Sequence, residues 1–465
     1  MKKILRKILR VPLESPAPDP VFDPDLDLQF ARDLALDHRI TFTRASTATF
    51  VGSNKLIQSA SNNVARFDHD PATGESLGLL IEGQRTNDIR ASEDFSDTSF
   101  WGVFGGMTVS ANQTTAPDGT TTADKLIEHS SGSNGPRIID SLSNAPFSTD
   151  TACVFSCFLK NNDARYAGLA VRSINGSNFN AEFDLQEGVV VSSGKHGNST
   201  FTSVEMKNYG NGWYRCVIIG KTDTSDVSSD MVIVSITDGS GVNSGGYGDN
   251  FTGNGSSIFA WGAQFDEATF ETSYIPTSGA AATRSKDLCD IPTNTFRFSE
   301  KEGSILIETE AFNDAGATHI FYRFHDGSTA ESITLLNKSN DTGQHRYQIK
   351  TGNSQIVGKN VAKSILQVFR SIVTYKKDNF TFASQGESPS AATSGTPPTG
   401  MTELSIGKNH GTANNLNGHI RTLQYFARQL DDETILALSQ PSLEPSLSLV
   451  FDSSETSFVD TELTR

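Results

Sequence analysis

Apolar and polar residues alternate in short runs along most of the chain, which is the pattern of β-strands with one buried face. Turns rich in Gly, Asn and Ser separate the runs, and from about 92 to 286 their spacing predicts a two-sheet sandwich of the jelly-roll kind. The strands predicted there are TACVFSCFLK (151–160), RYAGLAVRS (165–173), NAEFDLQEG (180–188), GWYRCVIIGKT (212–222), MVIVSITD (231–238) and SIFAWGAQFD (257–266).

A second set of alternating runs, from about 287 to 440, predicts another sandwich. GSILIETEAF (303–312) is an alternating strand, and FRSIVTYKKDNFTFASQG (369–386) is a hairpin that turns at Lys377-Asp378-Asn379. The segment 404–439 then predicts a strand, a loop, another strand and a short helix capped near Asp431 or Asp432.

The whole chain is therefore expected to be mainly β, with tandem β-sandwich (jelly-roll) domains and extended N- and C-terminal arms. RITFTRASTATFV (39–51) and LGLLIE (77–82) predict a small β-rich module ahead of the first sandwich. The expected units are a basic and Pro/Asp-rich anchoring arm, the small module, the two sandwiches and a C-terminal arm, at 1–27, 28–91, 92–286, 287–440 and 441–465.

The two arms differ from the rest of the chain. MKKILRKILRVPLESP at the N-terminus alternates basic and apolar residues, and the Pro/Asp-rich stretch after it favours an extended backbone. We expect an anchor into a larger assembly, with a frayed terminus as the alternative. PSLEPSLSLVFD, which begins at Pro441, predicts either an arm that adds a strand to a neighbouring subunit or a disordered tail.

Composition and charge narrow the range of partners. The 465 residues carry a formal net charge of -16, which argues against nucleic acid as a partner because phosphates must meet a basic surface. No apolar run approaches the roughly 20 residues that span a bilayer. Cys153, Cys157, Cys216 and Cys289 lack the spacing of a disulfide framework or zinc site, so we expect buried free thiols, which suit a reducing compartment.

The densest cluster of polar side chains is FDHDPATGE (67–75), which contains Asp68, His69, Asp70 and Glu75. A metal or hydrolytic site is one interpretation. The favoured one is a turn, because Asp70 can cap its own backbone, the following Pro fixes φ and the Gly accepts positive φ. Metal ligands usually converge from several elements, whereas these lie in one turn.

Two other features invite a functional interpretation. GGYGDNFTGNGSS (245–257) is similar to one unit of a calcium β-roll, but such rolls stack tandem copies, so a surface loop is favoured over a calcium site. Trp101, Trp213 and Trp261 could stack on sugar rings, yet each lies in or beside an apolar run, which favours the core. We expect no cofactor and no metal.

Catalytic signatures are absent from the sequence. Glycoside hydrolysis needs two carboxylates facing each other across a cleft, and nothing in the sequence pairs particular acids. There is no Gly-x-Ser-x-Gly elbow, no His-Glu-x-x-His and no phosphate-cradling loop, and the nine histidines are scattered. We expect no catalytic residues and a protein that is not an enzyme.

Several strings, in order, resemble a pattern of virion proteins of tailed bacteriophages, notably tail-fibre and tail-spike-like proteins. They are FTRASTATFV (42–51), NVARFDHDPATGESLGLLIEGQRTN (63–87), SEDFSDTSFW (92–101), APDGTTTADKLIE (116–128), NGWYRC (211–216) and WGAQFDEATFETSYIPTSGAAATR (261–284). The resemblance covers about 40–284. It implies a structural or receptor-binding virion part, made in the host cytoplasm, and it brings no catalytic residues.

The end of the second sandwich is similar to laminin-G and concanavalin A-like lectin domains, with an Asn-Gly turn, a strand and a terminal short helix. This resemblance implies glycan or protein recognition in some members and a structural role in others. The candidate glycan-binding residues, with ordinary loop polarity as the alternative, are Arg323, His325, Asp326, Asn340, His345 and Tyr347.

Two functions of different classes follow. The first is a tail-fibre or receptor-binding protein whose N-terminal arm binds other virion proteins and whose sandwich loops recognise host-surface polysaccharide or lipopolysaccharide. The second is a non-catalytic adaptor or head/tail decoration protein that binds only virion subunits. Both predict a homo-oligomer, a trimer in the fibre case, and a polysaccharide-degrading tail spike is a further alternative.

Overall fold

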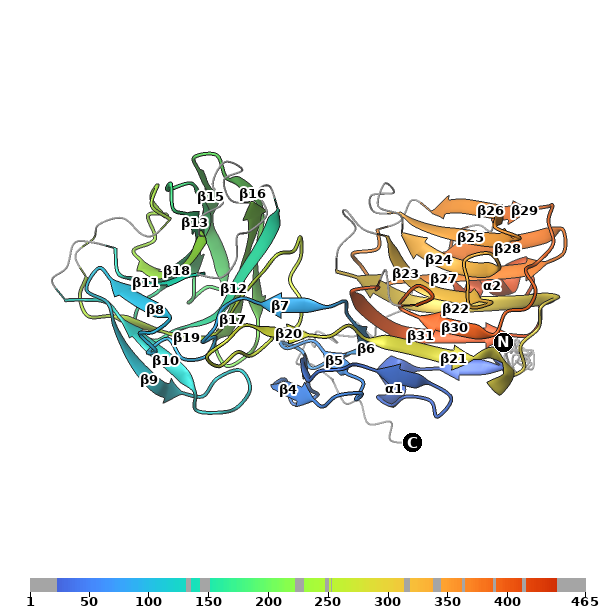
Figure 1. Cartoon of the computed structure of the whole chain (residues 1–465), viewed down its shortest axis with the longest axis horizontal. Helices are drawn as coiled ribbons and strands as arrows, with labels where there is room; N and C mark the ends of the chain where they lie inside the picture. Colours follow the sequence, from blue (N-terminus) through green and yellow to red (C-terminus); the bar gives the residue numbers. More distant parts are fainter. Residues whose placement is uncertain are drawn as a thin grey trace, which may run out of the picture.

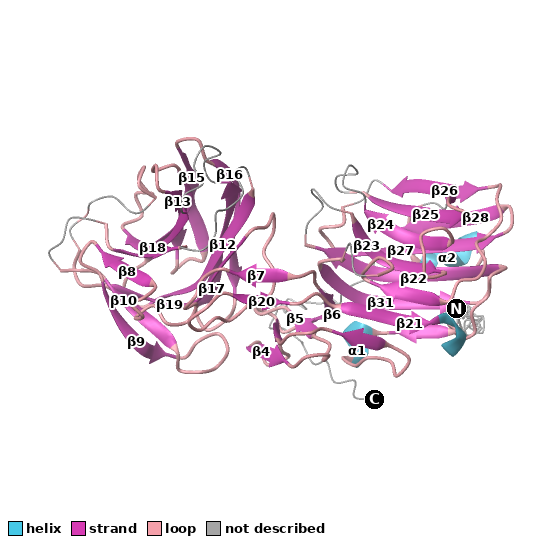
Figure 2. Cartoon of the chain, in the orientation of Figure 1, coloured by secondary structure: helices cyan, strands magenta, loops and turns pink. Residues whose placement is uncertain are grey.

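The computed structural model describes residues 23–130, 135–142, 151–221, 230–246, 251, 253–312, 318–337, 344–361, 364–387, 390–411 and 415–440. Two β-sandwiches lie side by side and are joined by a narrow ribbon (Figure 1), and helices are few and short (Figure 2). The predicted fold class, mainly β with tandem sandwiches, is confirmed. The arms at 1–22 and 441–465 lie outside the described residues.

The first sandwich packs two antiparallel six-stranded sheets face to face. One sheet has the order β16 (Thr200–Asn208), β17 (Trp213–Lys221), β12 (Ala152–Asn161), β19 (Ser257–Asp266), β10 (Ala123–Ile127) and β9 (Thr108–Thr114). The other has the order β15 (Val189–His196), β14 (Asn178–Asp184), β13 (Tyr166–Ser173), β18 (Asp230–Thr237), β11 (Arg137–Ser141) and β8 (Trp101–Phe104). The inward residues of both sheets form one hydrophobic core.

The second sandwich packs an eight-stranded sheet on a seven-stranded one. The larger sheet has the order β29 (Ser390–Ala392), β28 (Asn379–Ser384), β27 (Phe369–Lys376), β22 (Glu302–Ala311), β31 (Gly418–Phe426), β6 (Ser76–Ile81) and β5 (Phe67–His69), and β1 (Leu26–Leu28) also pairs with β31. The smaller has the order β2 (Thr41–Thr43), β21 (Leu288–Pro292), β30 (Glu403–Ile406), β23 (His319–His325), β24 (Ser332–Asn337), β25 (His345–Thr351) and β26 (Ser354–Val361).

The N-terminal segment differs from the separate module predicted for 28–91. Strands β2, β5 and β6 are hydrogen-bonded into the sheets of the second sandwich, and Leu79 and Ile81 are fully buried in its core. The physical reason is that strands of three to six residues cannot bury their apolar face without a partner sheet. The run 39–51 is also not one strand, because the chain bends at Ala45 and Ser46, between β2 and β3 (Ala48–Val51).

Short elements connect the two sandwiches. β3 pairs with β4 (Ile57–Ala60), and β7 (Arg85–Asn87) pairs with β20 (Ala282–Arg284) to form the ribbon between the sandwiches. The remaining elements are α1 (Phe30–Asp33), the 3-10 helix at Thr293–Thr295 and α2 (Asp432–Leu438). None of the helices in the described part of the chain is both long and apolar enough to cross a membrane.

Several local predictions are confirmed. β27 and β28 form the hairpin, with Lys377 and Asp378 as its two-residue turn, and the side chain of Asp431 caps α2 by accepting a hydrogen bond from Thr434 N at 2.8 Å. All three tryptophans lie in the core. The four cysteines are buried free thiols. The loop 245–257 lies partly outside the described residues.

Candidate functional site

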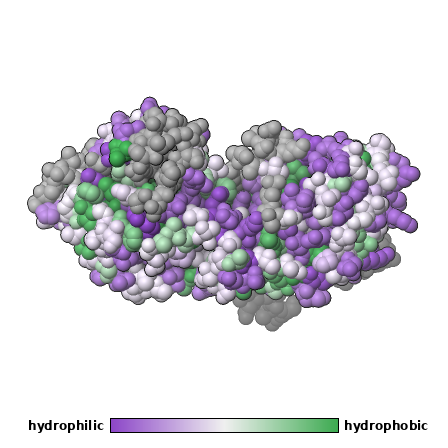
Figure 3. Space-filling model, in the orientation of Figure 1, coloured by the Kyte–Doolittle hydropathy of each residue, from purple (hydrophilic) through white to green (hydrophobic). Residues whose placement is uncertain are grey.

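A cleft of about 530 Å³ lies where the two sandwiches and the N-terminal segment meet. The space-filling view shows the hollow between the two halves of the molecule (Figure 3). Its lining comes from β16, β17 and the loop 269–273 on one side, and from β5, β6, β22 and β31 on the other. None of these segments is close to all the others in sequence, so only the folded chain creates the cleft.

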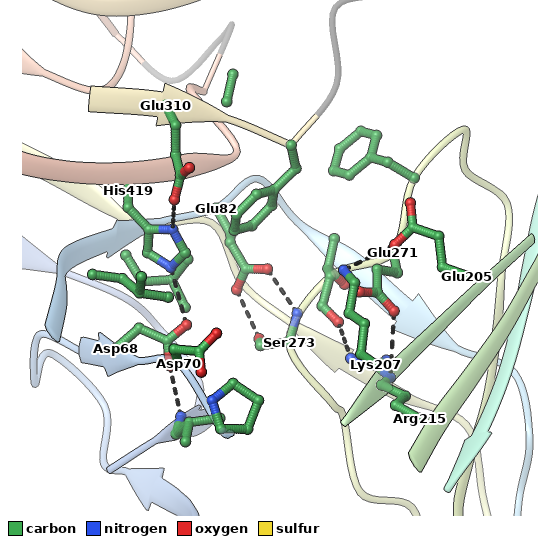
Figure 4. A pocket seen from close by; sticks show the side chains of 18 of the residues that line it. Asp68, Asp70, Glu82, Glu205, Lys207, Arg215, Glu271, Ser273, Glu310 and His419 are labelled. Carbon is green, nitrogen blue, oxygen red and sulfur yellow. Dashed lines mark hydrogen bonds and ion pairs between the residues drawn. The ribbon is translucent and has the colours of Figure 1, made fainter. Parts of the chain in front are cut away.

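One wall of the cleft is organised by His419 on β31 (Figure 4). Its Nε2 lies 3.0 Å from Asp68 Oδ2 and its Nδ1 lies 2.9 Å from Glu310 Oε1. Burial alone would lower the pKa of His419, but the hydrogen bonds to the two carboxylates outweigh burial and raise that pKa to about 9. The imidazole is therefore a cation at neutral pH that joins β5 to β22.

Two acidic residues of the cluster at 67–75, Asp70 and Asp68, have different structural roles. Asp70 Oδ1 accepts hydrogen bonds from Ala72 N, Thr73 N and Thr73 Oγ1 at 3.0, 2.6 and 2.8 Å, which confirms the predicted turn. Asp68 has a tertiary role, because it accepts from Val51 N at 2.7 Å and contacts His419. Among the described residues no group of three His, Cys, Asp or Glu side chains could hold a metal ion.

The opposite wall carries four paired charges on the first sandwich. Lys207 Nζ is in hydrogen-bond contact with Glu271 and lies 3.1 Å from Glu205 Oε2. Arg215 donates to Thr272 O at 2.8 Å and lies 3.6 Å from Glu271 Oε2. Burial would raise the pKa of Glu271, but the charges of Lys207 and Arg215 outweigh burial and hold it below the ordinary value.

Apolar side chains complete the lining near the second sandwich. Leu366 is 47% exposed, and it lines the cleft together with Phe312. The ring of Phe312 meets the His419 ring edge-on at a centroid distance of 5.0 Å. The cleft therefore combines an apolar surface with walls of hydrogen-bonding groups.

A buried ionic network lies beneath the cleft. Arg66 donates to Glu82 at 2.7 Å and to Asp287 at 2.6 Å. Arg284 lies 2.8 Å from Glu82, and Arg44 donates to Asp287 at 3.1 Å. All five side chains are at most 1% exposed. Such charges are stable in the interior only when they are paired and hydrogen-bonded.

Three of the six strings that resemble phage virion proteins contribute side chains to this network. FTRASTATFV contributes Arg44, the second string contributes Arg66 and Glu82, and the string that ends at 284 contributes Arg284. That last string also contributes Ser273, whose N–H donates to Glu82 Oε1 at 2.8 Å. These three strings thus meet at one buried junction beneath the cleft.

Two of the predicted glycan-binding residues, Arg323 and His325, lie on β23 and are 5% and 2% exposed. Arg323 donates to Thr334 Oγ1 at 3.0 Å and to Asn409. Gly327 N–H donates to His325 Nδ1 at 3.0 Å, so His325 Nε2 carries the hydrogen that faces Ser405 Oγ. Burial and nearby positive charges lower the pKa of His325 to about 4, so it is neutral.

The geometry around Ser405 does not form a nucleophilic pair. Ser405 Oγ donates to Asp290 Oδ1 at 2.7 Å, so its proton points away from His325. Lys408 Nζ lies 2.7 Å from the same Asp290 oxygen, so the ammonium charge compensates the carboxylate charge. Ser405 is fully buried, so this cluster holds β21, β30 and β23 together.

The other predicted residues are not brought into a site. His345 was expected in a loop and lies instead on β25, and Tyr347 lies on a strand as expected; both side chains are fully buried. His345 stacks on Phe369 at a centroid distance of 4.4 Å, and Tyr347 contacts Ser371 Oγ at 3.1 Å. Asp326 accepts two hydrogen bonds from Ser328 in a turn. Asn340 lies outside the described residues.

Sequence reasoning missed most of the cleft. Lys207, Glu271, Glu310 and His419 lie in strands or loops that the sequence places far apart, and no spacing connects them. A usable signal exists only for Glu205 and Lys207, whose i, i+2 spacing on a strand puts both side chains on one face.

Comparisons with known proteins give no family. No protein-family model matches the chain, and a search of curated proteins finds no match. Similar solved structures include the carbohydrate-binding module of a Ruminococcus gnavus sialidase bound to α2,3-sialyllactose, with 13% identity over 30% of this chain and 84% of that one, at a TM-score of 0.27.

Two further similar structures cover more of the chain. Domains LG4-5 of the mouse laminin α1 chain match at 10% identity over 80% of this chain and 96% of that one, with a TM-score of 0.23. Trypanosoma rangeli sialidase matches at 14% identity over 68% and 60%, with a TM-score of 0.26. Such low scores carry no argument, so the sandwich architecture rests on the strand order itself.

Proposed function

We propose that the protein is a receptor-binding component, such as a tail fibre, of a tailed-bacteriophage virion, and that it binds host-surface glycan in the cleft between its two sandwiches. The observation that carries the proposal is the lining of the cleft. Leu366 and Phe312 offer apolar surface beside charged walls, and a sugar ring presents both an apolar face and a rim of hydroxyl groups. The volume of about 530 Å³ lies in the range typical of small-ligand sites.

The same cleft supports binding without catalysis. A glycosidase needs one carboxyl group that stays protonated until it donates to the leaving oxygen, which requires a raised pKa. Burial would raise the pKa of Glu310, but the hydrogen bond from His419 lowers it. The pKa of Glu271 is also lowered, and that of Glu82 falls to about 2 because Arg284 and Arg66 outweigh its burial. These acids stay ionised at neutral pH.

The virion assignment rests on the resemblance of about 40–284 to phage tail proteins. In this proposal the N-terminal arm attaches to other virion proteins, and a homo-oligomer, a trimer in a fibre, presents several clefts at once. Multiple copies turn weak individual sugar binding into strong attachment. Mass spectrometry of purified particles tests this part directly, because the protein must be present in virions.

Glycan binding is tested on an array of bacterial surface oligosaccharides with the full chain and two variants. Leu366→Asp places a charge on the apolar surface of the cleft and is expected to weaken binding roughly tenfold or more. Val189→Asp is the matched control, because Val189 is 51% exposed on β15, outside the cleft lining. Equal binding by both variants would contradict the cleft assignment. A protein found in virions that binds no glycan would be the adaptor or decoration protein instead.

A further inference from the structure

We infer that the cleft selects a saccharide rich in hydrogen-bond donors and free of carboxylate, sulfate or phosphate groups, and that it prefers an amino sugar with a free ammonium group. This inference rests on the glycan-binding function proposed above and specifies the class of its ligand. Its first support is the charge of the lining. Two basic side chains, Lys207 and Arg215, and the imidazoles of His69 and His419 line the cleft. The carboxylates in the lining are Asp68, Asp70, Glu82, Glu205, Glu271 and Glu310.

The second support is that the basic groups are already engaged. Both ring nitrogens of His419 contact carboxylates, at 3.0 and 2.9 Å, and His69 Nδ1 lies 3.1 Å from Val51 O. Lys207 is shared between Glu205 and Glu271, and Arg215 donates to Ser156 Oγ and to Thr272 O. The positive charges of His419, Lys207 and Arg215 are therefore compensated by neighbouring carboxylates, so they attract an anionic sugar less than unpaired cations would.

The third support is that acceptor atoms remain available. Asp70 points into the cleft (Figure 4), and only its Oδ1 is used by the turn. The Glu205 side chain is 49% exposed at the rim. Carboxylate oxygens accept and do not donate, so they fit hydroxyl and ammonium groups.

The field of the whole chain acts in the same direction. The formal net charge is -16, so an approaching polyanion is repelled at long range, and the acidic cleft adds a local repulsion that salt screens only partly. An ammonium group is attracted both by the net negative charge of the chain and by the carboxylates of the cleft. The preference for an amino sugar over its neutral counterpart is therefore expected to shrink as salt rises.

The array described above supplies the first test when its binders are sorted by charge. We expect neutral and amino oligosaccharides among the binders, a stronger signal for amino sugars at about 20 mM salt than at about 200 mM, and no binder that carries only acidic groups. Acidic glycans that bind as well as neutral ones, and that lose binding in Leu366→Asp, would overturn the inference while glycan binding stands. No binding of any glycan overturns both.

Variants of Glu205 give the second test. Glu205→Gln removes one rim carboxylate and is expected to reduce the preference for amino over neutral sugars about threefold to tenfold, and Glu205→Lys is expected to admit acidic glycans. The matched control is Glu187→Gln, because the Glu187 side chain is 58% exposed and lies outside the cleft lining. If both Glu205 variants keep the charge preference of the unmodified chain, as the control must, the inference is wrong. Circular dichroism of each variant confirms that it is folded.

Discussion

His419 holds two carboxylates that come from distant parts of the chain, and this contact depends on pH. Its pKa in the folded protein is about 9, against an ordinary value of 6.5. A raised pKa means that the folded state binds the proton more tightly than the unfolded state. The contact therefore stabilises the fold fully below about pH 6.5, and this contribution is lost as the pH rises through about 9.

The first prediction concerns His419→Gln. The variant removes the titrating group, so the fall in unfolding free energy between pH 6.5 and 9, up to about 3 kcal/mol in the unmodified protein, should largely disappear. Urea unfolding at several pH values across this window measures it. His38→Gln serves as the control because the His38 side chain is 89% exposed. An unchanged pH profile in His419→Gln would show that the contact does not form.

The buried network gives the second prediction at this scale. Asp287 accepts from Arg44, Arg66 and the backbone N–H of Glu82, and its side chain is fully buried. Asp287→Asn keeps the size but removes the charge, so buried guanidinium groups lose their compensation. We expect a loss of about 3–5 kcal/mol of unfolding free energy, measured by chemical denaturation. Asp378→Asn, at an exposed hairpin turn, should cost less than about 1 kcal/mol, and equal losses would contradict this.

At the scale of elements, β6 makes an unusually close contact with β31. Gly78 has φ +89°, and a Cβ built on it would lie 2.4 Å from the backbone oxygen of Ile420. Gly78→Ala is therefore expected to destabilise the second sandwich by more than about 2 kcal/mol, since both backbone strain and overlap oppose it. Gly194→Ala on β15 is the matched control, because a Cβ there meets nothing within 4 Å. Thermal unfolding of the two variants measures the difference, and an equal fall in the melting temperature of both would contradict the prediction.

Elements that depend on local chemistry were predictable from the sequence. The two-residue turn at Lys377 and Asp378 and the cap at Asp431 follow from residues within a few positions of each other. The pairing of Leu79 with Ile420 joins positions more than 300 residues apart, and nothing in either segment specifies its partner. The cleft was unpredictable for the same reason, because pairings of this kind bring its walls together.

Two of the residues predicted to bind glycan lie in the core for a related reason. His345 and Tyr347 alternate with polar residues on β25, and the sequence cannot say which face of the strand meets the core. The structure turns this pair inward, where His345 stacks on Phe369. The prediction relied only on these residues being polar. Polar side chains can also lie in the core when they find hydrogen-bond partners there, so polarity alone does not distinguish a ligand contact from a core contact.

At the scale of the whole molecule, the N-terminal segment belongs to both the second sandwich and the junction. It supplies β1, β2, β5 and β6 to the sheets, and Arg44, Arg66 and Glu82 to the network. Asn87, at the end of β7, donates to the backbone oxygens of Ala263 and Ile275 in the first sandwich at 3.0 and 2.8 Å. One segment thus sets the position of both sandwiches and of the cleft between them.

The last prediction follows from that arrangement. A chain that lacks residues 1–87 loses strands from both sheets of the second sandwich and leaves β31 and β21 with unpaired edges. We expect limited proteolysis to degrade the region 287–440 quickly. Most of 92–286 should stay protected, because every strand of its two six-stranded sheets comes from that range. The full chain, digested in parallel, should protect both regions. A truncated chain whose second sandwich resists digestion would mean that residues 28–91 form an independent module, and glycan binding by that chain would remove the cleft from the proposed function.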